Sequence, residues 1–138
     1  MDRNSSGGIP DALLDTSIDD GVFRALVDRT RRYSLYLLLD RRSMSTSELA
    51  DELAGWLHAA GYGLADSDDR ERLRAELYHV HLPTLVDAEL VECDERFTVV
   101  ELAPLRGPVV DLLEWSRAYE RRPGNSSWTA TGGPDGEP

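Results

Sequence analysis

The chain of 138 residues is long enough for one compact domain, and 41% of its residues are hydrophobic, enough for a single packed core. It carries 26 acidic and 15 basic residues, for a formal net charge of −11. No apolar run approaches the about 20 residues of a membrane-spanning helix, and residues 1–10 lack a signal-peptide pattern, so we expect a cytoplasmic protein with no membrane partner. The lone Cys93 excludes an internal disulfide and cannot alone form a thiolate metal site.

The basic residues are all arginine, and the sequence contains no lysine. Acidic surfaces with few lysines suit a very salty cytoplasm, because carboxylates hold hydrated cations there and charge repulsion is screened. In molar salt the Debye length is about 3 Å, so the net charge loses much of its long-range influence on binding. We therefore expect a halophilic protein, with an ordinary acidic protein from a GC-rich genome as the alternative.

The two ends of the chain are polar and contain glycine, serine or proline, which predicts disordered tails over residues 1–17 and 123–138 around one domain over residues 18–122. The first helix is predicted to begin after Asp19, a suitable N-cap. A hydrophobic staple is formed by Ile18 and Phe23, and an apolar face by Val22, Leu26 and Val27.

A second helix is predicted over residues 31–40, with Thr30 as its cap. Apolar side chains surround it almost completely, so it should be the central buried helix. The third helix has the clearest start, because Ser45 and Glu48 have the spacing of a capping box. Its core face repeats at helical spacing up to about residue 59 and comprises Leu49, Leu53, Trp56 and Leu57.

A fourth helix is predicted over residues 69–88, with a buried face of Leu73, Leu77 and Val80. Pro83 lies inside this pattern and should kink the helix near residues 79–82, because proline removes one backbone hydrogen bond. One β-hairpin follows around the turn at residues 94–96, and Pro108 opens a last helix that ends near residue 121. The expected fold is mainly α with one β-hairpin, a winged helix-turn-helix with an added C-terminal helix.

The segment from Ser45 to Ala54 resembles the first helix of a helix-turn-helix, and the segment from His81 to Glu92 resembles the end of the recognition helix in ArsR-like winged-helix repressors. Over residues 20–103 the chain is similar to a haloarchaeal winged-helix-like domain family of unknown function. Two departures are visible: residues 61–69 lengthen the connection between the two motif helices, and Glu89 replaces the usual glycine.

The resemblance implies a DNA-binding transcriptional regulator that reads double-stranded DNA with the fourth helix. By its position on the motif, the face opposite the predicted core would enter the major groove with Arg72, Ala75, Glu76 and His79, flanked by Arg70 and Arg74 for phosphate contacts. The alternative is a solvated helix face with ion pairs such as Arg72–Glu76.

Further basic residues are candidates for contacts to the DNA backbone or minor groove. Arg96, in the acidic turn 94–96, is a candidate for the minor groove, or else part of a plain hairpin turn. Arg31 and Arg32, together with Arg41 and Arg42, flank the central helix, where they would either clamp phosphates or pair with surface acids.

The last helix is predicted to form a homodimer interface through Val109, Leu112, Leu113, Trp115 and Tyr119, with packing onto the chain's own core as the alternative. We expect no enzymatic activity and no cofactor. His79 and His81 lie two residues apart and point in different directions on a helix, so they cannot readily share a metal ion. The main alternative function is a winged-helix module that binds proteins and not DNA, favoured by the acidic turn and net charge.

Overall fold

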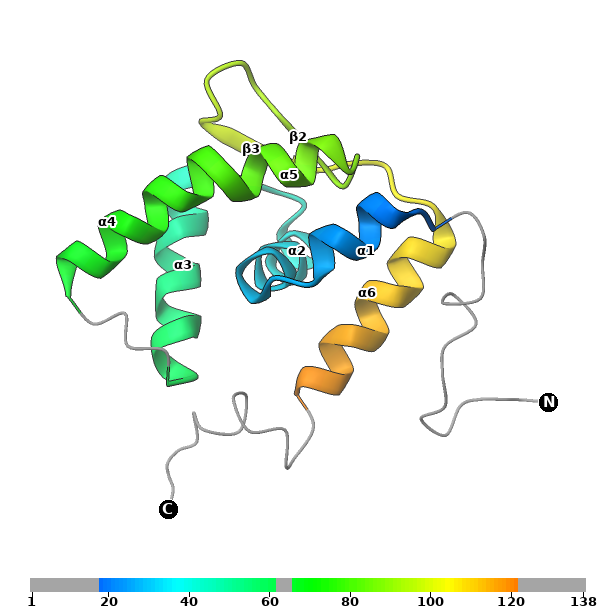
Figure 1. Ribbon diagram of the computed structural model, residues 1–138, viewed down its shortest axis with the longest axis horizontal. Coiled ribbons are helices and arrows are strands. Elements are labelled where there is room, and N and C mark those ends of the chain that lie inside the picture. The colour runs from blue at the N-terminus through cyan, green and yellow to red at the C-terminus, as the bar shows by residue number, and fades with distance from the viewer. Residues whose placement is uncertain (1–17, 62–65, 122–138) are drawn as a thin grey trace.

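The computed structural model describes residues 18–61 and 66–121. The predicted tails, and residues 62–65 of the connection after the third helix, lie outside the described residues. The elements run in this order (Figure 1): α1 (Asp20–Leu26), α2 (Arg29–Arg41), β1 (Ser43–Ser45), α3 (Thr46–Ala59), α4 (Ser67–Glu76), the π-helical turn η2 (Leu77–His81), α5 (Leu82–Asp87), β2 (Val91–Cys93), β3 (Val99–Leu102) and α6 (Gly107–Glu120).

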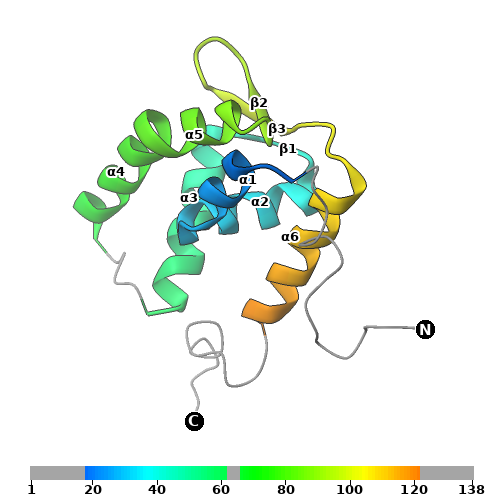
Figure 2. The ribbon, with the colours of Figure 1, turned by 45° about the vertical axis from the view of Figure 1, so that its right-hand side comes forward.

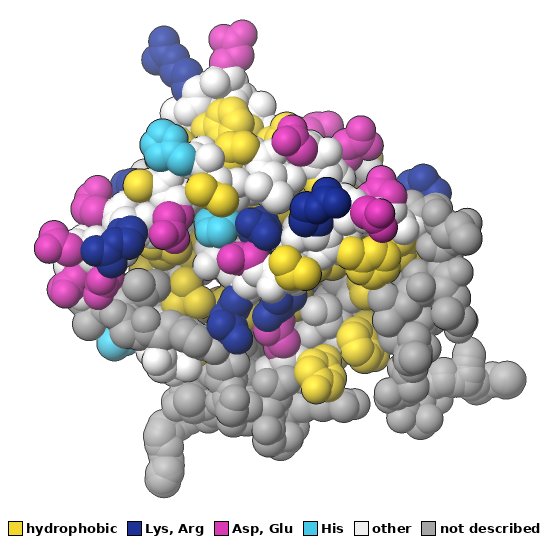
Figure 3. Space-filling model, viewed as in Figure 1, with side chains coloured by type: hydrophobic (Ala, Val, Ile, Leu, Met, Phe, Trp, Pro, Cys, Tyr) yellow, Lys and Arg dark blue, Asp and Glu magenta, His cyan; other side chains and the backbone are white. Residues whose placement is uncertain are grey.

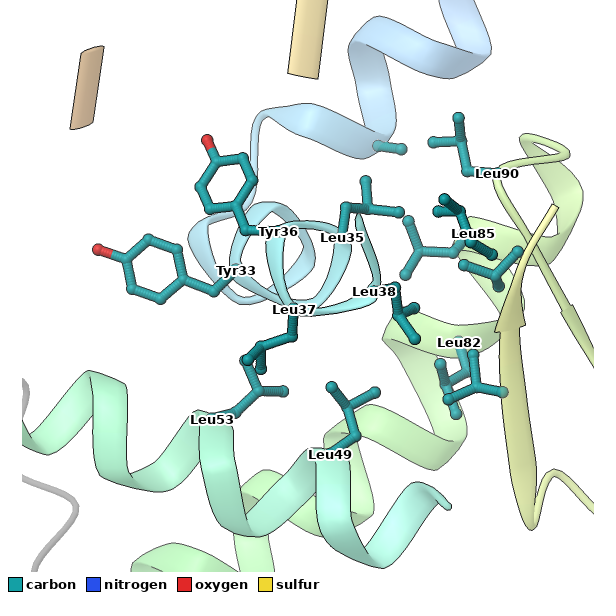
Figure 4. Close-up of a cluster of buried hydrophobic side chains, with 14 of the residues drawn as sticks. Tyr33, Leu35, Tyr36, Leu37, Leu38, Leu49, Leu53, Leu82, Leu85 and Leu90 are labelled. Carbon is teal, nitrogen blue, oxygen red and sulfur yellow. The ribbon is translucent and has the colours of Figure 1, made fainter. Parts of the chain in front are cut away.

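Helix α2 is the centre of the molecule, as its apolar sequence predicts. Every side chain from Tyr33 to Leu38 is buried. Leu37 points toward Leu53 of α3, whereas Leu35 lies on the side of α2 that faces Leu85 of α5 (Figure 4). Because the other elements pack around this helix, removal of its apolar side chains from water supplies much of the stability of the fold.

The helix starts are partly as predicted. Asp19 caps α1, and Ser45 and Glu48 form the predicted capping box at the start of α3. The cap of α2 was wrongly assigned to Thr30: the Asp28 carboxylate accepts a hydrogen bond from the backbone N–H of Arg31, so the helix begins at Arg29. Aspartate is as good a cap as threonine or better, and the earlier cap adds helical residues.

Two valines expected in the core are exposed. Val27, expected on the apolar face of α1, is 74% exposed, and Ala25 takes the buried position instead. Val80, expected beside Leu73 and Leu77, is 48% exposed. Val27 keeps a helical backbone, but it follows the buried Val22 by five residues and so points to another side of the helix. Val80 lies within η2, where the period of the helix changes.

The predicted hairpin is present and belongs to a three-stranded antiparallel sheet of order β1-β3-β2. Strand β1 was not predicted, and it pairs Met44 with Val100 of the hairpin. The order α2, β1, α3, α4–α5, β2, β3 is that of a winged helix. Helices α3 and α4 lie on one side of the central helix and α6 on the other, in both ribbon views (Figures 1 and 2).

Glu89 ends α5 in a backbone conformation that favours glycine. Its φ is 64°, and the N–H groups of Glu89 and Leu90 donate to the carbonyls of Val86 and Leu85, at 2.9 and 3.0 Å. These two bonds are those of the Schellman motif, whose left-handed residue is usually glycine. A side chain with a Cβ atom is therefore strained at this position.

We expect Glu89→Gly to raise the free energy of unfolding by about 1 kcal/mol, because glycine adopts this conformation without the Cβ clash. Chemical denaturation of the purified variants measures the change. Asp87→Gly, at the last residue of α5, is the matched control and should not raise stability, because glycine gains no advantage at a helical position. Equal effects of the two substitutions would contradict the assignment of strain to Glu89.

Candidate nucleic-acid interface

Helix α4 presents one face to α3 and the other to solvent. Leu73 and Leu77 are 5% and 0% exposed, and both belong to the hydrophobic core. The opposite side carries the predicted groove-facing residues, all of which are exposed: Arg70, Arg72, Ala75, Glu76 and His79. The prediction of exposed Arg72 and His79 beside a buried face of Leu73, Leu77 and Val80 is confirmed except for Val80, which is exposed. The outer face is therefore open to a large partner.

Charges of both signs are mixed along this face. Over residues 66–76 five carboxylates (66, 68, 69, 71 and 76) accompany the three arginines. Arg72 lies 3.3 Å from Asp69 and remains 68% exposed, and Arg74 lies 3.6 Å from Asp51 of α3. Acidic and basic side chains are interspersed over the face that carries α1 and α4 (Figure 3). The helix offers exposed guanidinium groups without an unbroken basic stripe.

The N-terminal end of α4 is capped from within the chain. The carboxylate of Asp66 accepts from the backbone N–H of Asp69 at 2.8 Å, and Asp68 and Asp69 lie in the first turn. Negative charge at this end stabilises the helix through its dipole. The same charge repels phosphate, so Arg70 and Arg72 on the side of the helix are better placed for DNA than its first turn.

The wing, the turn over residues 94–98 that joins β2 to β3, is held against α3. The Asp94 carboxylate accepts from the backbone N–H groups of Thr98 and Val99 at 2.7 and 3.0 Å, and from the Thr98 hydroxyl. These hydrogen bonds lower the pKa of Asp94. The backbone N–H of Thr46, the first residue of α3, donates to the Thr98 carbonyl at 2.9 Å. Arg96 is exposed at the turn.

Arg31 was predicted as a phosphate clamp and instead binds inside the chain. Its Nε donates to the carbonyl of Ala25 at 2.8 Å and its Nη2 to the carbonyl of Arg24 at 3.3 Å. The last carbonyls of a helix have no partner within the helix. Arg31 supplies partners for two of them at the end of α1, so its role is to dock α1 onto α2.

Arg32 also bonds within the chain, and it follows the alternative of pairing with an acid, although that acid is largely buried. Its Nη1 donates to the carbonyls of Leu26 and Val27 at 2.9 and 3.2 Å. Its Nε and Nη2 bind both carboxylate oxygens of Glu120 on α6, each at 3.0 Å. The pair is largely buried, with 19% and 12% of the two side chains exposed. The sequence carries no local signal for a partner so far along the chain.

His81 is buried beside Arg31. Among the described residues no group of three or more ligating side chains is assembled. The Nδ1 of His81 lies 3.1 Å from Nη1 of Arg31 and 3.9 Å from a carboxylate oxygen of Asp28. Arginine can only donate, so Nδ1 is the acceptor and the ring is neutral. Burial lowers the pKa of His81, assisted by Arg31 and opposed by Asp28 and Glu76.

The lowered pKa of His81 makes stability depend on pH. Below the ordinary value of 6.5 the unfolded chain binds a proton that the folded chain does not, so stability falls as the pH falls from 6.5 through the lowered pKa. We expect the wild type to lose more unfolding free energy than His81→Gln between about pH 7.5 and pH 5. Denaturant titrations at several pH values measure both slopes. Parallel curves for the two proteins would show that His81 is not the titrating group.

The predicted dimer face of α6 is largely inside the chain's own core. Val109, Leu112 and Leu113 are 6%, 5% and 0% exposed. These three residues therefore pack onto the chain's own core, which was the alternative to a dimer interface. Trp115 is half-buried and stacks on Tyr119, with ring centroids 5.6 Å apart. Only these two of the five predicted residues reach the surface, so any contact with a second copy through them would be small.

A separate pocket of about 410 Å³ opens between the end of α5 and strand β2. It is lined by Val86, Glu89, Val91, Glu92, Cys93, Ala103 and Pro104. The sheet register places Glu92 directly opposite Glu101, and both are exposed. Like charges at such a position lower stability. Burial raises the pKa of the Cys93 thiol, which keeps it protonated and weakly reactive.

The comparisons with known proteins give a family and no function. The family model described as a domain of unknown function (DUF7344) matches residues 23–101, more than half of the chain. The chain belongs to this DUF7344 family. The match begins in α1 and ends in β3, so it covers the winged-helix core and leaves α6 outside. No curated protein and no solved structure matches the chain. Within the described ranges, no helix is both long and apolar enough to cross a bilayer.

Proposed function

We propose that this DUF7344 protein is a DNA-binding transcriptional regulator whose recognition helix is α4 with its continuation through η2 and α5. The proposal rests chiefly on one observation. In the winged-helix arrangement, the second helix of the helix-turn-helix, α4 with η2, keeps an open outer face that carries Arg70, Arg72 and His79. Arginine recognises guanine in the major groove or binds phosphate, and the wing with Arg96 is exposed.

The proposal also includes the salt concentration, the cellular compartment and the oligomeric state in which the protein acts. The acidic, lysine-free surface supports work in the cytoplasm of a halophile, where salt screens repulsion between the carboxylates and DNA. In a homodimer, two recognition helices about 34 Å apart would bind the two halves of a two-fold symmetric operator. Trp115 and Tyr119 are the surface residues of α6 that would meet the second copy.

The decisive experiment selects binding sites from random double-stranded DNA in about 2 M KCl, with affinities measured by fluorescence anisotropy in the same salt. Specific binding should persist in this salt, because cation uptake at the acidic surface offsets the usual loss. Arg72→Ala should weaken binding to the selected site by about tenfold or more. Arg106→Ala, an exposed arginine directly before α6 with no predicted DNA contact, is the control and should bind as the wild type does. No enriched sequence at any salt concentration would refute the proposal.

A second candidate function is a protein-binding module, favoured by the pocket beside β2. Glu89 and Glu92 line it and Glu101 lies next to them on the sheet, so the surface suits an arginine or lysine side chain with an apolar stem. A peptide library rich in basic residues tests this function in the same salt. Binding that is lost in Glu92→Gln while DNA selection fails would favour it over DNA recognition.

A further inference from the structure

Val80 lies on the wrong side of its helix for an uninterrupted α-helical period. It follows Leu73 by seven residues, close to two turns at 3.6 residues per turn, and should share the buried face of Leu73. Instead Val80 is 48% exposed and His81, one residue later, is 6% exposed. The turn η2 supplies the extra residue, because the backbone N–H of Leu82 donates to the carbonyl of Leu77, five residues before it.

The sequence around Val80 holds this π-helical turn in place. Pro83 has no N–H to donate to the carbonyl of His79, and its ring would collide with that carbonyl in a regular α-helix. The Thr84 hydroxyl donates to the carbonyl of Val80 at 2.7 Å. On the inner side, Arg31 binds His81 at 3.1 Å. Contacts of the residues after Val80 therefore fix the π-helical turn, and the turn keeps Val80 exposed.

The result is a branched apolar side chain on the outer side of the recognition helix, directly after the exposed His79. Nothing in the packing of the core requires a valine there, because half of the side chain is open to solvent. π-helical turns inside α-helices occur frequently at functional sites. In the major groove, the apolar feature of a base edge is the C5-methyl group of thymine, which apolar side chains contact.

We propose that Val80 is a specificity-determining residue that contacts the 5-methyl group of a thymine in the target site. This inference rests on the proposed function. The inference adds a base preference that the polar residues of the recognition face do not specify. At the base pair that Val80 contacts, thymine is favoured because of its methyl group.

The test uses the selected DNA site and a copy of it for each thymine, in which deoxyuridine replaces that thymine and removes only the methyl group. For the wild type, one substitution should weaken binding about fourfold, the value of one buried methyl group. In Val80→Ala, which lacks the two γ-methyl groups of valine, the same substitution should weaken binding clearly less than in the wild type. Val27→Ala removes an exposed valine from the end of α1 and is the matched control, with the methyl dependence unchanged.

The ratio of the two affinities is taken within each variant, so a change in the folded fraction does not alter it. If deoxyuridine weakens binding of Val80→Ala as much as it weakens the wild type, the assignment of Val80 is overturned while DNA recognition stands. If no thymine shows a methyl effect, the assignment is also overturned. Failure to select any DNA site refutes the proposed function itself, and the inference falls with it.

Discussion

Arg32→Ala is expected to lower the free energy of unfolding by about 3 kcal/mol, because it removes one partner of a largely buried ion pair. Glu120 would keep a carboxylate of which 12% is exposed, beside the Tyr36 hydroxyl that also donates to it. The carbonyls of Leu26 and Val27 at the end of α1 would lose their donor as well. Burial and the Glu120 carboxylate raise the pKa of Tyr36, so its hydroxyl stays protonated and donating.

Thermal and chemical denaturation of Arg32→Ala and Arg41→Ala, in the same high salt, measure this effect. Arg41 forms an ion pair with Glu52 at 2.7 Å, but 45% and 35% of the two side chains are exposed. An exposed pair contributes little to stability, and less in salt. If both variants lose the same small amount, then the contact of Arg32 with Glu120 does not fasten α6 to the core.

The helices were predictable where the signal is local. The capping box of Ser45 and Glu48 and the apolar residues of α2 depend on neighbours within one or two turns, and the structure has both as predicted. Strand β1 was missed because its three residues are too few to show alternation, and its pairing partner β3 lies far along the chain. The Asp28 cap had a local signal and could have been found.

In the candidate site too, features that depend on nearby residues were predictable, and features that depend on distant segments were not. Exposure of Arg72 and His79 followed from helical spacing, and that spacing holds until Leu77. Beyond it, Pro83 signalled a disturbance without indicating its form, so the π-helical turn and the exposure of Val80 were not predictable. The internal roles of Arg31 and Arg32 depend on the docking of α1 and α6. Two adjacent arginines at the start of a helix look the same in sequence whether they bind phosphate or carbonyl groups.

Helix α6 combines core and surface residues, and separate substitutions should give separate effects. Leu112→Ala is expected to lower the free energy of unfolding by about 3 kcal/mol, because Leu112 is 5% exposed and its truncation leaves a cavity. A loss of this size is a large fraction of the stability of a small domain. Replacing Trp115 and Tyr119 together by alanine should cost less stability, since Trp115 is half-buried and Tyr119 is 48% exposed.

The double substitution of Trp115 and Tyr119 also decides whether the chain dimerises through α6. If it does, light scattering in high salt should find a dimer for the wild type and a monomer for the double variant, with unchanged helical circular dichroism. Phe23→Ala is the control, because Phe23 is a 39% exposed aromatic residue on α1 and should leave the dimer intact. A monomeric wild type, or a double variant that stays dimeric, would exclude the proposed interface. Recognition of a two-fold operator would then need another contact between the two copies.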